Sequence, residues 1–143
     1  MNELKEYSFD ELLIGHKENF TLQITESLVN KFAKISGDMN PLHVDDEYAK
    51  SINFESKVCH GMLLSSFFSR LIGMKLPGKN ALYFSQTLNF QNPCYVDDEI
   101  LVEGEIIAKS NSTQIIEIST KIFHKNGLCL VDGIAKVIVK NIG

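Results

Sequence analysis

The chain has 143 residues, of which 44% are hydrophobic and 22% charged, values typical of a single folded domain spanning residues 1–143. Its net charge of −4 argues against nucleic acid as a partner, because phosphate binding requires a basic face. No apolar run approaches the roughly 20 residues that span a bilayer, so we expect no membrane segment.

The first part of the chain predicts a strand followed by a helix. Apolar and polar residues alternate from Phe20 to Ile24, which is the period of a half-buried strand. Thr25 can then cap a helix whose apolar residues recur at helical spacing, and Gly37 is a good residue to end it. A short helical turn is expected over residues 47–51, with carboxylates at its start.

Residues 61–74 are the most apolar segment and predict a buried helix. Its apolar residues spread almost all round a helix, and the small residues Ser65, Ser66, Ser69 and Gly73 permit neighbours to approach closely. A helix that is apolar all round is a buried one. The segment is shorter than the roughly 20 residues that cross a bilayer, so we interpret it as the centre of the protein core.

A period of two follows Pro77-Gly78 and predicts a run of antiparallel strands. We expect these strands over residues 82–90, 100–108, 115–123 and 128–139, with a tight hairpin at Asn126-Gly127. One buried helix followed by such strands indicates an α+β layout. The sheet must wrap the helix to hide its whole circumference, which is the hotdog arrangement.

An acid and an imidazole, Asp38 and His43, flank the dipeptide Asn40-Pro41. Proline has a fixed φ and no amide proton, and it keeps the preceding residue out of helical conformation. Both side chains are therefore expected on a bent, rigid loop that could aim them at one water molecule. These residues alone favour the simpler interpretation that Ser36-Gly37-Asp38 only ends a helix and that His43 lies on the surface, and later motifs reverse that preference.

Gly61, at the start of the predicted buried helix, is a second candidate. The first amides of a helix have no intrahelical partner, and a glycine lets a ligand approach them closely. Such amides suit an oxygen that gains negative charge, for example a thioester carbonyl becoming an enolate. Gly61 could instead be only a packing residue. His60 is expected to stabilise this loop, and Cys59 is expected to be a buried thiol rather than a nucleophile.

The three cysteines, Cys59, Cys94 and Cys129, are an odd and widely spaced set without a C-x-x-C pair. This favours reduced thiols in a cytoplasmic protein over a disulfide framework or a zinc site. The first residues also lack the basic start and apolar core of a signal peptide, which agrees with a cytoplasmic location.

Several short motifs between Phe20 and Gly104 carry a resemblance to a known family. They are F-A at 32–33, S-G-D-M-N-P-L-H-V-D at 36–45, H-G-M-L at 60–63, L-P-G at 76–78, Y-F-S-Q at 83–86 and N-P-C-Y-V at 92–96. The chain resembles the MaoC-like dehydratases, and within that family the R-specific enoyl-CoA hydratases match best. It departs from the family pattern at Lys79-Asn80, which leaves the preferred acyl-chain length open.

The resemblance implies a role for each matching residue. Asp38 and His43 would hold the catalytic water, and the Gly61 amide would contact the thioester oxygen. Asn40 belongs to the signature as a substrate-binding or supporting residue. Ser69, chosen by its spacing on the buried helix, would support Asp38 by a hydrogen bond. No metal is required, because polarisation can come from the Gly61 amide, and no cofactor is implied besides the coenzyme A thioester that is the substrate. Family members are generally homodimers.

The implied reaction is addition of water to trans-2-enoyl-CoA, giving R-3-hydroxyacyl-CoA, or the reverse dehydration. Two enzymatic alternatives share the fold, an acyl-ACP dehydratase and an acyl-CoA thioesterase, but a thioesterase would not be expected to carry this signature. A noncatalytic acyl-CoA-binding module is a further alternative. The presence of Asp38, His43 and Gly61 together weighs against it.

Overall fold

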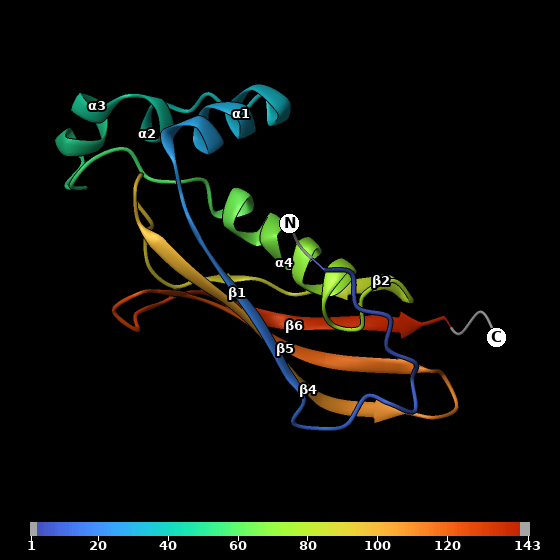
Figure 1. The fold of residues 1–143 in the computed structure, drawn as a ribbon. Helices are drawn as coiled ribbons and strands as arrows, with labels where there is room; N and C mark the ends of the chain where they lie inside the picture. The colour runs from blue at the N-terminus through green and yellow to red at the C-terminus, as the bar shows by residue number, and fades with distance from the viewer. Residues whose placement is uncertain (1–2, 141–143) are drawn as a thin grey trace.

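The computed structural model describes residues 3–140 and contains one antiparallel sheet and four helices (Figure 1). The six strands run in the order β1-β4-β5-β6-β2, and β3 pairs with β6 beside β2. The strands are β1 (Lys17–Gln23), β2 (Ala81–Gln86), β3 (Asn89–Phe90), β4 (Glu99–Ser110), β5 (Ile115–His124) and β6 (Cys129–Val139), and the helices are α1 (Glu26–Ser36), α2 (Pro41–Val44), α3 (Asp46–Ser51) and α4 (Gly61–Met74). No helix within residues 3–140 is both long and apolar enough to cross a membrane.

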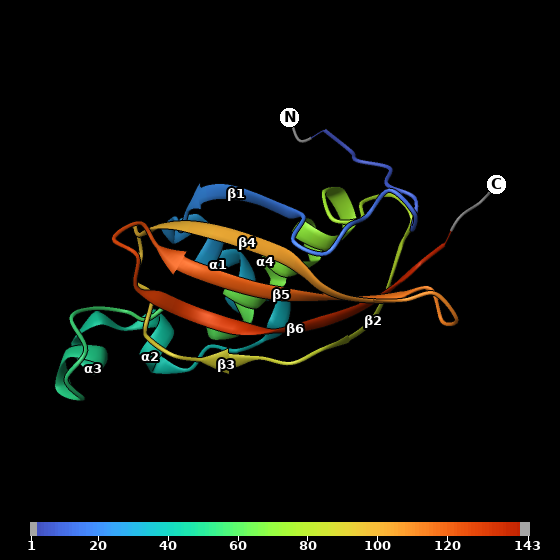
Figure 2. The same cartoon turned by 90° about the horizontal axis from the view of Figure 1, so that it is seen from below.

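Helix α4 lies along one face of the curved sheet, and α1, α2 and α3 gather beyond its N-terminal end (Figures 1 and 2). Its buried face carries Leu64, Phe68 and Leu71, each at most 2% exposed. Gly104 of β4 makes room for this packing, since a Cβ there would lie 2.8 Å from the Leu71 Cδ2 atom. The predicted α+β hotdog arrangement is therefore confirmed.

The prediction that the sheet hides the whole circumference of α4 is wrong for a single chain. Met62 is 57% exposed, and Ser66 and Ser69 on the same side of the helix are also exposed. On the edge strand β2, Tyr83 faces this side of the helix and lines a cavity with Met62 and Ser69, and it is 37% exposed. The sheet curves around one side of the helix only, so an apolar strip remains uncovered along α4 and β2.

The strand predicted over residues 82–90 is broken into β2 and β3. Both pieces pair with β6, and the break lies at Thr87-Leu88. Thr87 turns toward β6 there: its amide donates to the Ile134 carbonyl, and its hydroxyl accepts from the Ile134 amide. Gly133 permits this approach, because a Cβ on Gly133 would lie 1.8 Å from the Thr87 carbonyl oxygen.

The predicted boundaries of α1 are confirmed. The Thr25 hydroxyl accepts from the Leu28 amide at 3.2 Å, and Gly37 ends the helix in the left-handed conformation with φ of 79°. The loop predicted across Asn40-Pro41 is only partly correct, because α2 begins at Pro41 and carries His43. Proline disfavours helix before it but suits the first helical position, where its missing amide proton is not needed.

Candidate active site

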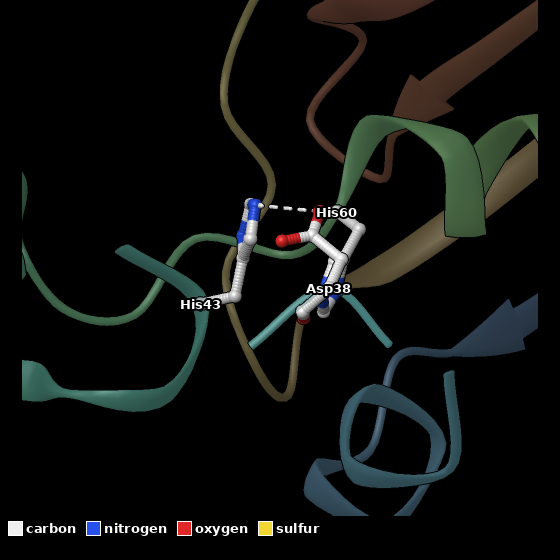
Figure 3. Close-up of side chains that lie close together, drawn as sticks. All are labelled: Asp38, His43 and His60. Carbon is white, nitrogen blue, oxygen red and sulfur yellow. Dashed lines mark hydrogen bonds and ion pairs between the residues drawn. The ribbon is translucent and has the colours of Figure 1, made fainter. Parts of the chain in front are cut away.

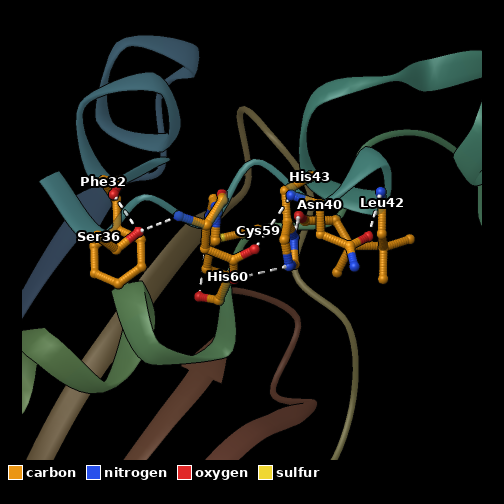
Figure 4. A network of polar contacts seen from close by, with 9 residues as sticks. Phe32, Ser36, Asn40, Leu42, His43, Cys59 and His60 are labelled. Carbon is orange, nitrogen blue, oxygen red and sulfur yellow. Dashed lines mark hydrogen bonds and ion pairs between the residues drawn. The ribbon is translucent and has the colours of Figure 1, made fainter. Parts of the chain in front are cut away.

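Asp38 lies in the short loop between α1 and α2, immediately after the residue that ends α1. Its amide donates to the Ser36 hydroxyl at 3.1 Å, and its carboxylate accepts from the Asn40 amide at 3.2 Å. Figure 4 follows this network from Ser36 to Leu42. The side chain is 50% exposed, so the carboxylate is held by its own loop yet remains open to water and ligand.

His43 faces Asp38 from the turn of helix α2 (Figure 3). Its Nδ1 lies 2.6 Å from the Val58 carbonyl oxygen, and since a carbonyl can only accept, Nδ1 carries the proton. The lone pair of the neutral ring is therefore on Nε2, which lies 3.9 Å from the Asp38 Oδ2 atom. That distance is too long for a direct hydrogen bond and leaves room for a shared water molecule to accept or donate a proton.

The first amides of α4 form the third part of the site. His60 occupies the N-cap position but makes no side-chain cap bond, although capping residues usually satisfy these amides. Within residues 3–140, neither the Gly61 nor the Met62 amide donates to an acceptor. Two donors at the positive end of a helix are thus available to a developing oxyanion.

A cavity of about 370 Å³ brings the imidazole and the helix start together. Both His43 and Gly61 line it, and most of the remaining wall is apolar, including Leu64, Phe90 and Leu130. A Cβ on Gly61 would lie 2.7 Å from the Phe90 ring. The cavity can therefore hold an acyl chain next to the base, and Phe90 is a wall residue that the sequence pattern did not single out.

Of the two predicted supporting residues, Asn40 lies in the loop that carries the pair, whereas Ser69 lies away from it. The Asn40 side chain accepts from the Leu42 amide at 3.0 Å and caps α2, so it shapes the loop that carries Asp38 and His43. The predicted bond from Ser69 to Asp38 is not formed. Ser69 is eight residues beyond Gly61, which is about 12 Å along the helix.

Ser69 instead lines a second cavity, of about 420 Å³, on the uncovered side of α4. Phe32 and Tyr83 contribute to the same cavity. Burial raises the pKa of Tyr83 to about 12, so its phenol stays protonated at neutral pH and is no candidate base.

The prediction that Cys59 is a buried thiol is confirmed. Cys59 is 2% exposed, and its thiol donates to the His60 carbonyl. A side-chain hydrogen bond with Cys59, together with burial, raises the pKa of the neighbouring Cys94. Since the thiolate is the reactive form, Cys94 is not poised as a nucleophile.

Asp38, His43 and His60 place one potential ligand atom each within 4.8 Å of one another. The two imidazoles are stacked, however, with ring centroids 3.9 Å apart and planes inclined by only 23°. The lone pairs of an imidazole lie in its plane, so two nearly parallel rings do not direct them at one ion. This geometry fits an acid–base site better than a metal site.

A family model described as a MaoC-like domain matches residues 13–127. The chain is 39% identical to the (R)-specific enoyl-CoA hydratase of Aeromonas caviae, over 91% of this chain and 97% of that protein. It is 41% identical to a mitochondrial 3-hydroxyacyl-[acyl-carrier-protein] dehydratase of Arabidopsis thaliana, over 92% and 80% respectively. The solved R-hydratase PhaJ1 of Pseudomonas aeruginosa superposes with a TM-score of 0.91 at 33% identity, covering 96% of this chain and 88% of that one. Because the family model covers most of the chain and the Aeromonas caviae relative is matched over nearly its whole length, the chain belongs to the MaoC-like dehydratase family.

Proposed function

We propose that the protein is an R-specific enoyl-CoA hydratase, which adds water to trans-2-enoyl-CoA to give R-3-hydroxyacyl-CoA or catalyses the reverse dehydration. The observation that carries the proposal is the 3.9 Å separation of the Asp38 Oδ2 and His43 Nε2 atoms beside a cavity that Gly61 also lines. An acid–base pair, an apolar pocket and free amides are the three elements that this reaction needs.

In the proposed mechanism, Asp38 and His43 hold one water between them. As its oxygen bonds to C3 of the enoyl group, the pair takes one of its protons. The C2–C3 π electrons move toward the thioester carbonyl, whose oxygen becomes an enolate stabilised by the Gly61 amide. The pair then returns a proton to C2. Asp38 and His43 act as one proton-holding unit, and the Val58 carbonyl supports the ring when it is charged.

The proposed substrate is an acyl-CoA thioester, and the reaction uses no cofactor or metal, because the pair and the helix amides supply both proton transfer and polarisation. Cytoplasmic location is also part of the proposal. It is supported by the three free thiols of Cys59, Cys94 and Cys129.

A second candidate is dehydration of a 3-hydroxyacyl group carried by acyl carrier protein, which the similarity to the Arabidopsis dehydratase favours. Both candidates use the same chemistry and differ in the carrier. Comparing kcat/KM for crotonyl-CoA with that for the matched crotonyl-acyl-carrier-protein distinguishes them. A higher value for crotonyl-CoA supports the hydratase, and a higher value for the carrier protein supports the alternative.

The product of hydration is expected to be the R-3-hydroxyacyl thioester. This expectation comes from the similarity to R-hydratases, because the residue types at the site do not determine which face of the alkene is attacked. Coupling the product to an S-specific 3-hydroxyacyl-CoA dehydrogenase should give no NADH, while an R-specific dehydrogenase should give a full signal. A strong signal with the S-specific enzyme would contradict the stereochemical assignment.

The working form is proposed to be a homodimer that covers the apolar strip along α4 and β2. Support comes from the exposed Met62 and Tyr83 on this strip and from the free edge of β2, which is a pairing surface for another strand. Light scattering should give about 32 kDa, twice the 16.1 kDa chain.

Introducing a charge into this strip tests the dimer. Tyr83→Glu should shift the mass toward the monomer, because an unpaired carboxylate would be buried between the two copies. Leu13→Glu is the matched control: Leu13 is 66% exposed but precedes β1 at the opposite edge of the sheet. A monomeric mass for the unmodified chain at micromolar concentration, with full hydratase activity, would contradict the proposal.

A further inference from the structure

We propose that His60 is a positioning residue, which sets Asp38 and His43 relative to each other without touching the substrate. This role rests on the proposed hydratase function and adds to the site a side chain that is only 2% exposed. His60 contacts both members of the acid–base pair and directly precedes Gly61, so it lies where the three parts of the site meet.

The first contact ties the Asp38 loop to the start of α4. The His60 Nε2 lies 3.0 Å from the Asp38 backbone carbonyl oxygen, which can only accept, so Nε2 carries the proton and donates. The other polar contacts of Asp38 in the described residues come from Ser36, Asn40 and His43, all within its own segment. His60 therefore supplies the hydrogen bond that fixes this loop against a distant part of the chain.

The second contact is with the face of the His43 ring. The two imidazoles stack with centroids 3.9 Å apart (Figure 3). The Phe32 ring also packs edge-on against His60, with ring centroids 4.9 Å apart. His43 is thus held at its edge by the Val58 carbonyl and across its face by His60. An imidazole restrained at both places keeps its Nε2 lone pair aimed toward Asp38.

The remaining ring nitrogen of His60 makes no competing contact. Its Nδ1 is buried and has no hydrogen-bond partner within residues 3–140. The polar contact of the ring is therefore the one to the Asp38 carbonyl, and its face is left to stack on His43.

Three variants separate the two contacts. His60→Gln keeps a donor near the position of Nε2 but removes the ring, whereas His60→Phe keeps the ring and removes the donor. Each should lower kcat for crotonyl-CoA by about 10-fold, and His60→Ala, which loses both contacts, by about 10²-fold, the usual effect of small misplacements of catalytic groups. KM should stay within about threefold of the unmodified value, because misplacement of the pair lowers turnover rather than ground-state binding.

A double-variant cycle distinguishes positioning from general structural support. In the His43→Gln background, His60→Ala should lower the residual kcat by much less than 10²-fold, since one of the groups that it positions is already absent. Ile72→Val is the matched control: Ile72 is equally buried but belongs to the core cluster at the other end of α4, and the change should reduce thermal stability while leaving kcat within about twofold.

The outcomes are separable. A folded His60→Gln or His60→Ala protein with unchanged kcat, or an equal loss in both backgrounds, would overturn the positioning role and leave the hydratase function standing. An unmodified protein that hydrates neither crotonyl-CoA nor its carrier-protein thioester would overturn the proposed function and this role together. Thermal unfolding of every variant identifies losses that come only from a smaller folded fraction.

Discussion

Asp38→Asn and His43→Gln are each expected to lower kcat for crotonyl-CoA hydration by about 10²–10⁴-fold, the usual contribution of a general acid–base group. Each change keeps the size of the side chain and removes its ability to exchange a proton with a water held between Oδ2 and Nε2 in the proposed mechanism. The double variant should be little slower than the worse single variant, since residues that act as one unit are not additive.

Asp45→Asn is the matched control for this pair. Asp45 lies in the same segment and caps α3 through the Glu47 and Tyr48 amides, and asparagine caps equally well. It should keep kcat within about twofold. Circular dichroism must show that all variants fold, and substantial hydration by a folded Asp38→Asn or His43→Gln protein would remove that residue from the mechanism.

Gly61→Ala is expected to lower kcat by about 10²-fold, because the added methyl group blocks access to an amide that stabilises the enolate oxygen. The alternative, that Gly61 is only a packing residue, makes a different prediction. Its Cβ would meet the Phe90 ring at 2.7 Å, so a steric effect should be relieved by removing that ring.

The double variant Gly61→Ala/Phe90→Ala therefore decides between the two. If the amide binds the oxyanion, kcat remains low in the double variant, whereas recovery to the level of Phe90→Ala would show that the loss came from packing. Gly73→Ala is the control within the same helix: a Cβ there meets nothing within 4 Å, and alanine favours helix more than glycine. Gly73→Ala should keep kcat and raise the unfolding temperature.

Local signals in the sequence were sufficient for most of the fold. Thr25 and Gly37 mark the ends of α1 by their own chemistry, and a period of two located the strands to within a few residues. The candidate pair was also predictable, because the Asn40-Pro41 dipeptide forces the chain to bend between Asp38 and His43. The 3.9 Å separation across that bend was not predictable, because the Val58 carbonyl and the stacked His60 ring that contact His43 come from a distant segment.

The features that were not predicted depend on contacts between distant segments. The irregular N-terminal segment buries Phe9 and Leu12 against Ile72 and Leu76 without any periodic pattern. The expectation that α4 is buried all round was wrong within one chain. An apolar residue that packs in the core and one that lies on the uncovered strip cannot be told apart from the sequence. Spacing alone likewise could not show that Ser69, about 12 Å along the helix from Gly61, faces the second cavity rather than Asp38.

The central claim is that this site adds water to an enoyl thioester. The most direct measurement is incubation of the purified protein with crotonyl-CoA while enoyl absorbance and free thiol are recorded in the same reaction. The proposed mechanism predicts loss of absorbance without thiol release, because water adds to C3 and the thioester stays intact. Release of thiol in step with substrate loss would show thioester hydrolysis instead, and no change in either signal with crotonyl-CoA and with its carrier-protein thioester would contradict a catalytic role for Asp38 and His43.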